Sequence, residues 1–183
     1  MAYAYARPCP SPAYVTAREV AAVSLTHPVA SDHQLARLLQ IGMVLEEVVE
    51  ARAYKHHETL AADELDADIV ELLEEAAEES EEHRKRLEEL VDELEADPVA
   101  YEEIEALVAA RYEAEADFDG VLYDQLCNEE TAYKFYDDLI GAIESSEVTF
   151  SIDRERLLTV LREIREEEKE GVEEVTRLME DRP

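Results

Sequence analysis

Residues 69–94 read IVELLEEAAEESEEHRKRLEELVDEL. Apolar or small residues recur there at alternating steps of three and four, which is the spacing of one face of a helix that packs in a bundle. The positions on this face are Ile69, Leu73, Ala76, Ser80, His83, Leu87, Leu90 and Leu94. We therefore predict a long helix that begins between Asp63 and Asp68 and ends near Ala96.

Helix-forming residues dominate the rest of the chain as well. The 183 residues include only four glycines and six prolines, a composition that favours helices over strands. Further helices are expected from Ser31 or Asp32 to about Leu60, from Pro98 to about Ala116, from about Val121 to Ile143, and, capped by Ser151, from Ile152 to Met179. The predicted fold class is all-α, with a four-helix bundle in residues 31–183.

The N-terminal region differs in composition from the rest. Only two of the 48 acidic residues, Glu19 and Asp32, lie in the first 42 positions. Residues 1–30 are rich in Ala, Tyr, Pro and Val without a helical period, and we expect them to be a poorly ordered extension. Two alternatives are a docking tail for a partner and a true start near Met43.

The charge of the chain excludes several partners. The net charge is −31 at pH 7, and such a surface repels nucleic acid and anionic membranes. No apolar run approaches the ~20 residues that span a bilayer, and no secretory signal pattern is seen, so a cytoplasmic location is expected. The acids are spread over every predicted helix. This favours a solvated surface typical of a halophilic, high-salt cytoplasm over a cation-collecting surface.

The two cysteines of the chain do not form a recognisable metal-binding or disulfide pattern. Cys9 and Cys127 are the only cysteines, and they lie far apart in the sequence. Without a CxxC pair, neither a rubredoxin-type iron centre nor a cysteine zinc knuckle is expected, and a disulfide framework is not expected either.

Two other predicted helices carry the same kind of stripe. Its positions are Leu122, Leu126, Glu129, Tyr133, Tyr136, Ile140 and Ile143 in one, and Leu157, Leu161, Ile164, Glu168, Gly171, Val175 and Leu178 in the other. All three stripes are apolar at both ends and interrupted near the middle, at Ser80 and His83, at Glu129, and at Glu168 and Gly171. Because the midpoints of packed helices lie at similar heights, a histidine and two glutamates should converge inside the bundle.

Buried carboxylates need a compensating partner. An unpaired one costs several kcal/mol, and two close together cost more. Protonation, ion pairing or a metal can offset this cost, but no Lys or Arg occupies the stripe positions. A divalent cation is therefore expected, and glutamate with histidine suits iron, manganese or zinc.

The first predicted helix is less clear. Its best apolar stripe is Ile41, Val44, Val48 and Ala51. Glu47 lies beside that stripe, on a face that it shares with Met43, Glu50, Tyr54 and His57. Periodicity alone predicts that Glu47 is half buried.

The segment Glu129-Glu-Thr-Ala-Tyr-Lys-Phe-Tyr136 resembles the third bundle helix of the ferritin-like superfamily, and of rubrerythrins in particular. There a ligand glutamate is followed three residues later by Ala and seven residues later by Tyr. Glu47 and Tyr54 repeat the seven-residue step in the first helix. The resemblance covers about residues 43–180 and implies that the helix at 98–116 is part of the long crossover of that fold.

The resemblance also implies a set of metal ligands. The family carries Glu-x-x-His on helices 2 and 4, whereas this chain has Ser80 before His83 and Gly171 after Glu168. Four of the six ligand positions are therefore matched, by Glu47, His83, Glu129 and Glu168. Glu50, or Glu79 or Glu82 after a shift of register, could substitute for a missing ligand. Tyr54 and Tyr136 would lie near the site as hydrogen-bonding or redox-active phenols.

Two functions from different classes are consistent with these patterns. The first is an iron-binding ferritin-like protein, with one or two ions, that acts as a ferroxidase or scavenges oxidants. The second is a catalytically degenerate bundle that serves as a regulatory or protein-interaction module, with a homodimer as one form it could take. In the second case the core glutamates would be protonated or bonded to tyrosines.

Overall fold

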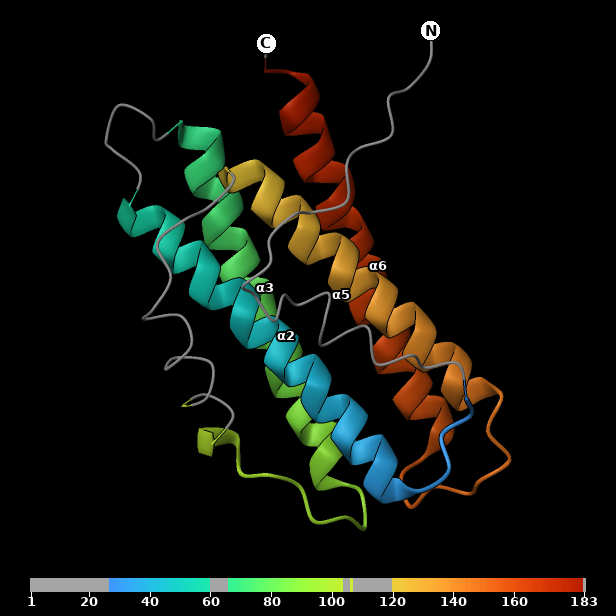
Figure 1. The fold of residues 1–183 in the computed structure, drawn as a ribbon. Helices are drawn as coiled ribbons and strands as arrows, with labels where there is room; N and C mark the ends of the chain where they lie inside the picture. Colours follow the sequence, from blue (N-terminus) through green and yellow to red (C-terminus); the bar gives the residue numbers. More distant parts are fainter. Residues whose placement is uncertain (1–26, 60–65, 104–105, 107–119, 183) are drawn as a thin grey trace, which may run out of the picture.

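Helices form where the sequence repeats apolar residues at steps of three and four. The structure is a computed structural model that describes residues 27–59, 66–103, 106 and 120–182. Its long helices are α2 (Asp32–Thr59), α3 (Ala67–Asp92), α5 (Val121–Glu144) and α6 (Arg154–Glu180) (Figure 1). The described part contains no strand, so the all-α prediction is confirmed there, with helix ends within a few residues of those expected.

Side-chain caps fix where three of the helices begin. The backbone N–H of Gln34 donates to Ser31 Oγ at 3.1 Å, so of the two predicted caps, Ser31 and Asp32, Ser31 is the one that caps α2. The carboxylate of Asp66 caps α3. At α6 the expected cap was wrong: the Arg156 N–H donates to Asp153 Oδ1 at 2.8 Å, whereas Ser151 lies two residues before this cap.

Contacts at both ends show that α2 and α5 run in opposite directions. His56 near the end of α2 lies 3.3 Å from Asp124 near the start of α5. At the other end, the N–H of Val29 donates to the carbonyl of Ala142 at 3.2 Å.

Helices α3 and α6 are also antiparallel. The N–H of Glu95, just after α3, donates to Ser151 Oγ before α6 at 2.8 Å, and Arg182 after α6 pairs with Asp66 before α3 at 2.8 Å. With α2 antiparallel to α3 as well, α3 ends at one end of the bundle and α5 begins at the other (Figure 1). The end of α3 and the start of α5 therefore lie a bundle length apart.

The core confirms the stripe of α3 and most of that of α6, where Gly171 and Leu178 are only partly buried, and it corrects the one proposed for α2. Seven of the eight α3 positions are buried, with Ile69 at the edge only partly covered. On α2, only Val48 of that stripe is buried, whereas Ile41, Val44 and Ala51 are partly buried, so three of its four positions were wrong. The buried positions of α2 include Leu35, Leu39, Met43, Glu46, Val49, Ala53 and His56.

The buried face of α5 also differs in part from the expected one. Glu129, Tyr136, Ile140 and Ile143 lie inside as expected. Three other predicted positions are only partly buried: Leu122, Leu126 and Tyr133. Ala132, Phe135 and Leu139 take the interior positions around them. Both corrections have the same cause: an apolar residue at a helix flank looks the same in sequence as one that faces the core.

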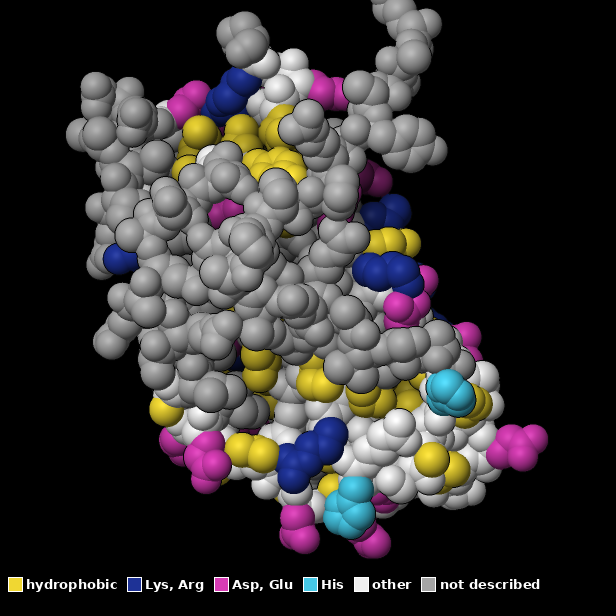
Figure 2. Space-filling view, in the orientation of Figure 1, with side chains coloured by type: hydrophobic (Ala, Val, Ile, Leu, Met, Phe, Trp, Pro, Cys, Tyr) yellow, Lys and Arg dark blue, Asp and Glu magenta, His cyan; other side chains and the backbone are white. Residues whose placement is uncertain are grey.

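Arginines link acidic side chains on the helix surfaces. Arg162 pairs with Glu144 at 2.6 Å and Arg165 with Asp137 at 3.1 Å, both across α5 and α6. Where Figure 2 shows the side chains of described residues, acidic ones are dispersed with basic ones among them. Exposed pairs of this kind each contribute about 0–1 kcal/mol.

Two expectations concern segments outside the described residues. The extension at 1–30 lies almost entirely there, and so does most of the short helix expected from Pro98 to Ala116. Residues before Met43 do belong to the core, since Leu35 and Leu39 are fully buried.

No helix among the described residues combines the length and apolarity required to cross a bilayer.

Candidate metal centre

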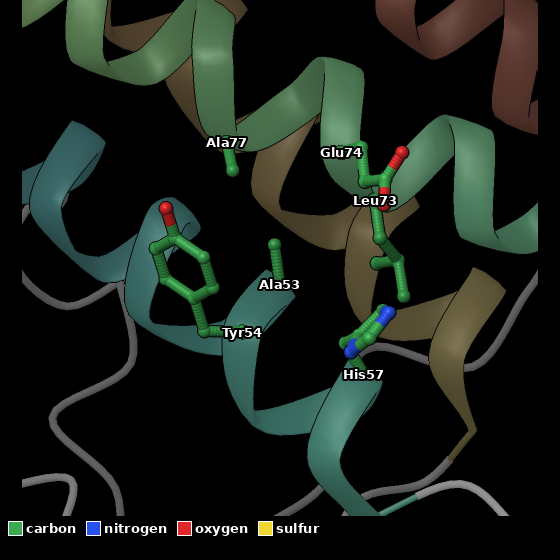
Figure 3. A pocket seen from close by; sticks show the side chains of 6 residues that line it. All are labelled: Ala53, Tyr54, His57, Leu73, Glu74 and Ala77. Atoms are coloured by element: carbon green, nitrogen blue, oxygen red, sulfur yellow. The ribbon is translucent and has the colours of Figure 1, made fainter.

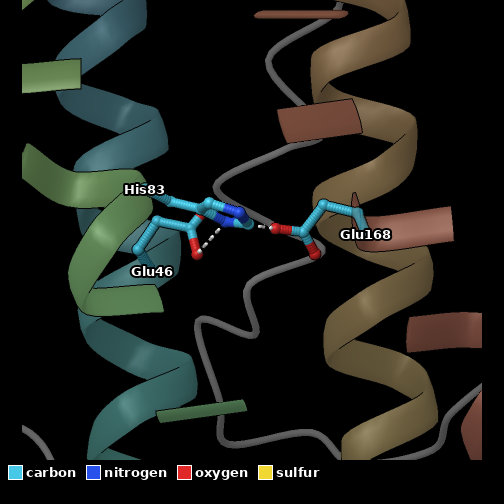
Figure 4. Close-up of side chains that lie close together, drawn as sticks. All are labelled: Glu46, His83 and Glu168. Carbon is cyan, nitrogen blue, oxygen red and sulfur yellow. Dashed lines mark ion pairs between the residues drawn. The ribbon is translucent and has the colours of Figure 1, made fainter. Parts of the chain in front are cut away.

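Three buried side chains from three helices meet at mid-height in the bundle. Glu46 on α2, His83 on α3 and Glu168 on α6 expose 1%, 2% and 5% of their surface. One potential ligand atom from each lies within 4.8 Å of the others. Figure 4 shows the imidazole of His83 between the two carboxylates.

The two nitrogens of His83 have different surroundings. Nε2 lies 2.9 Å from Glu167 Oε2, and Arg86 pairs with that same carboxylate. Nδ1 lies 3.0 Å from Glu168 Oε1 and 3.4 Å from Glu46 Oε2, without the geometry of a hydrogen bond to either. The ring is thus oriented from its outer side by Glu167, and its inner nitrogen faces the two buried carboxylates.

Tyr136 holds Glu46 in place from α5. Its hydroxyl donates a hydrogen bond to Glu46 Oε1, and its ring is fully buried. The other oxygen, Glu46 Oε2, has no hydrogen-bond partner. One oxygen of Glu46 is therefore fixed by the protein, and the other points to the centre of the cluster.

Glu129 is buried beside this cluster but is not one of its three members. Gln125 Nε2 donates to Glu129 Oε1 at 2.6 Å. The other oxygen, Oε2, lies only 2.3 Å from where a Cβ on Gly171 would be. The carboxylate of Glu129 therefore lies in the space that any side chain at position 171 would need.

Burial and mutual repulsion raise the pKa of two of these carboxyl groups. Desolvation, helped by the charge of Glu46, raises the pKa of Glu129 to about 7. The same two causes raise the pKa of Glu168 well above its ordinary value. Burial likewise raises the pKa of Tyr136, so its phenol stays protonated and remains a donor to Glu46.

The charge of His83 balances the carboxylates around it. Burial works against the charged ring, but Glu46 and the contacts with Glu167 and Glu168 outweigh it and raise the pKa of His83 to about 12. The hydrogen bond from His83, together with Arg86, lowers the pKa of Glu167 to about 2. Without a metal, the imidazolium form of His83 is the cation of the cluster.

The donor set fits a divalent cation. Glu46 Oε2 and His83 Nδ1 are buried atoms without hydrogen bonds, and they lie beside an oxygen of Glu168. Metal-bound histidines usually donate their second N–H to a carboxylate, which is the arrangement of Nε2 with Glu167. Oxygen ligands with one imidazole suit iron, manganese or zinc.

The structure brings together only some of the residues singled out in the sequence. His83, Glu168 and Tyr136 lie in the cluster, and Glu129 lies next to it. Glu47 does not: its carboxylate accepts from Tyr101 Oη at 2.6 Å and lies 3.3 Å from Arg84 Nε. The buried carboxylate of α2 is that of Glu46, one residue away and about 100° around the helix.

Glu50 and Tyr54 also lie away from the cluster. Glu50 pairs with Arg84. Tyr54 is 61% exposed and lines a hollow of about 120 Å³ between α2 and α3, with His57, Leu73 and Glu74 among its neighbours (Figure 3). They share the helix face of Glu47 and turn away from the interior with it.

Sequence reasoning missed Glu46, Glu167 and Gln125. Glu46 follows Leu39 and Met43 at steps of seven and three, so a stripe started from Leu39 would have included it. The seven-residue step from Glu47 to Tyr54 favoured the wrong glutamate of the adjacent pair. No pattern in the sequence separates Glu167 from the neighbouring acids of α6, because its role depends on His83 and Arg86 from α3.

Comparisons of the chain with known protein families, with curated proteins and with solved structures found no match.

Proposed function

We propose that the chain binds a divalent cation, with iron as the favoured ion, between Glu46, His83 and Glu168. The observation that carries the proposal is the meeting of three buried ligand atoms within 4.8 Å of one another, contributed by three different helices. Two carboxylates and a neutral imidazole would neutralise the cation. Binding would release the proton of His83, so affinity would rise with pH.

The order and direction of the helices support a ferritin-like arrangement for this proposal. Bundles of that class have one long crossover and carry a metal site in the core, built from carboxylates and histidines on facing helices. Here α3 ends and α5 begins at opposite ends of the bundle, and the cluster lies at mid-height. Tyr136 on α5 supports the α2 carboxylate.

The proposed chemistry is ferroxidase activity or oxidant scavenging. Bound Fe(II) would supply one electron per ion, so the reduction of one peroxide to water would consume two Fe(II) and two protons from solvent, and that of one oxygen molecule four of each. The residues of the chain would hold the ion, with Glu46 and Glu168 as anionic ligands and His83 as a neutral one. Glu167 would fix the ring of His83. Tyr136 would orient Glu46, and the apolar residues above and below would limit the access of water.

A second candidate is a scaffold or interaction module that needs no metal. The observation in its favour is the position of His83, whose charged form already lies between Glu46 and Glu168. In that case the cluster is a buried ion network, and its role is to specify how the helices pack.

Metal content after anaerobic Fe(II) loading and desalting tests the two candidates. We expect bound iron by elemental analysis, a change in the near-ultraviolet spectrum when air is admitted, and a melting temperature raised by the ion. Glu168→Gln should remove most of the binding. Glu170→Gln is the matched control, since it makes the same charge change on the same helix at an exposed position.

The outcomes separate the proposals. Iron that is retained by the wild type and by E170Q but lost in E168Q supports the metal centre. Absence of bound iron, manganese and zinc from the wild type, with an unchanged melting temperature, would exclude it and leave the scaffold.

A further inference from the structure

The space beside Gly171 holds a carboxylate close to the proposed site. A Cβ built on Gly171 would lie 2.3 Å from Glu129 Oε2, 2.7 Å from its Cδ and 3.4 Å from its Cγ. The first two separations are shorter than real Cβ atoms show, so Glu129 can occupy this place because residue 171 is glycine. The backbone of Gly171 is helical, so conformational freedom does not explain the glycine.

The resting position of Glu129 has its own support. Gln125, one turn earlier on α5, is 1% exposed and donates to Glu129 Oε1 at 2.6 Å. Glu129 is also close enough to Glu46 and Glu168 for their carboxylates to act on it. Yet among the described residues the group that can share one ion is limited to Glu46, His83 and Glu168.

We propose that the centre takes a single divalent cation and that Glu129 is its stored fourth ligand, held in the gap at Gly171 until the ion arrives. This inference rests on the proposed function and deepens it. Three ligand atoms surround one position, and the fourth carboxylate can join them by rotation about its side-chain bonds. The same gap leaves no residue at 171 to serve as a ligand for a second ion.

Gly171 thus lowers the affinity for the divalent cation, because the carboxylate of Glu129 is placed to coordinate the ion for only a fraction of the time. An apparent dissociation constant equals the intrinsic one divided by the fraction of the competent state. Gly171→Ala would fill the gap and push the carboxylate out of it. The clash involves the far end of a flexible side chain, so the carboxylate can move without a shift of the backbone.

Titration of the metal-free protein with Mn(II) by calorimetry tests the inference. We expect one Mn(II) per chain for the wild type and an affinity on the order of fivefold tighter for G171A. Gly141→Ala is the matched control, because Gly141 is also helical and a Cβ there meets nothing within 4 Å. In the E129Q background, G171A should leave the affinity unchanged.

A second variant keeps the test valid if G171A folds poorly. Gln125→Leu removes the donor that holds Glu129 in the gap, so it should tighten Mn(II) binding in the same way, and only when Glu129 is present. Thermal melts establish that each variant is folded.

Several results would overturn the inference. They are two Mn(II) per wild-type chain, an unchanged or weaker affinity in both G171A and Q125L, and an equal effect with and without Glu129. If the wild type binds Mn(II) and one of these results is found, the role of Glu129 as a stored ligand is excluded, but the proposed metal centre is still supported. If the wild type binds neither Mn(II) nor iron, the metal centre fails and the inference with it.

Discussion

Two tyrosines show at the residue scale how surroundings set the value of a hydrogen bond. Tyr136 donates to Glu46 in the fully buried centre. Tyr101 donates to Glu47 at 2.6 Å nearer the surface, where Arg84 also pairs with that carboxylate. The loss of a donor costs more where neither water nor a second partner can replace it.

Tyr136→Phe should therefore lower the free energy of unfolding of the metal-free protein by about 1–3 kcal/mol. Tyr101→Phe makes the same chemical change and should cost less than about 1 kcal/mol, since Arg84 and solvent remain available to Glu47. Urea unfolding of both variants measures the difference. Equal costs would mean that the buried position of Glu46 does not depend on Tyr136.

The pKa of Glu129 makes stability depend on pH. It is raised from 4.5 to about 7 in the folded state, so between these values the folded chain holds a proton that the unfolded chain releases. The contribution of this carboxyl to stability is thus present below pH 4.5 and is lost as the pH rises through 7.

Glu129→Gln removes the carboxyl group and with it the loss of stability at rising pH. Relative to the wild type, the metal-free variant should gain on the order of 3 kcal/mol between pH 4.5 and pH 7.5. Glu130→Gln, an exposed neighbour, should show a flat difference over the same range. Chemical unfolding with a chelator present, at a series of pH values, measures both. A flat difference for E129Q would mean that Glu129 ionises normally.

At the scale of the helix, rotation decides which side chains reach the interior. Glu46 and Glu47 are adjacent, yet one lies in the cluster and the other pairs with Arg84, because successive residues differ by about 100°. Where polar residues interrupt the apolar pattern, as in α2, the sequence leaves the rotation open. The stripe of α3 has apolar residues on both sides of Ser80 and His83, so most of its buried face could be predicted.

The start of α6 offers a test at this scale. Asp153→Ala removes the cap at the Arg156 N–H and should destabilise the protein by about 1 kcal/mol. Asp153→Asn keeps a capping oxygen and should cost only a small fraction of that value. Thermal or urea unfolding compares the two variants, and similar losses in both would show that the charge of Asp153 matters more than its cap.

At the scale of the whole molecule, the net charge of −31 opposes the compact state. The described arginines pair with some of the acids, but most of the charge has no basic counterpart. Salt screens this repulsion, and the Debye length falls from about 10 Å at 0.1 M to about 3 Å at 1 M.

We therefore expect the melting temperature to rise as NaCl increases from about 0.1 M to about 1 M, with most of the rise at the lower concentrations where screening changes fastest. Sucrose acts by exclusion from the surface and serves as a control without screening. A melting temperature that falls with NaCl would indicate that the arginine pairs outweigh the repulsion between acids.

The sequence by itself determined the helical class, the approximate helix ends, and the burial of His83, Glu129, Tyr136 and Glu168. Composition and the period of apolar residues are local properties of the chain, so these features follow from the order of the residues.

Only the tertiary structure decided the members of the cluster. It shows that Glu46, and not Glu47, is the α2 member of the cluster. It also shows that Glu167 contacts Nε2 of His83 and that the carboxylate of Glu129 lies in the gap at Gly171. Each of these facts depends on the rotation of one helix against another or on a contact across the bundle. Such relations are absent from the spacing within one helix, because they arise only when the helices pack.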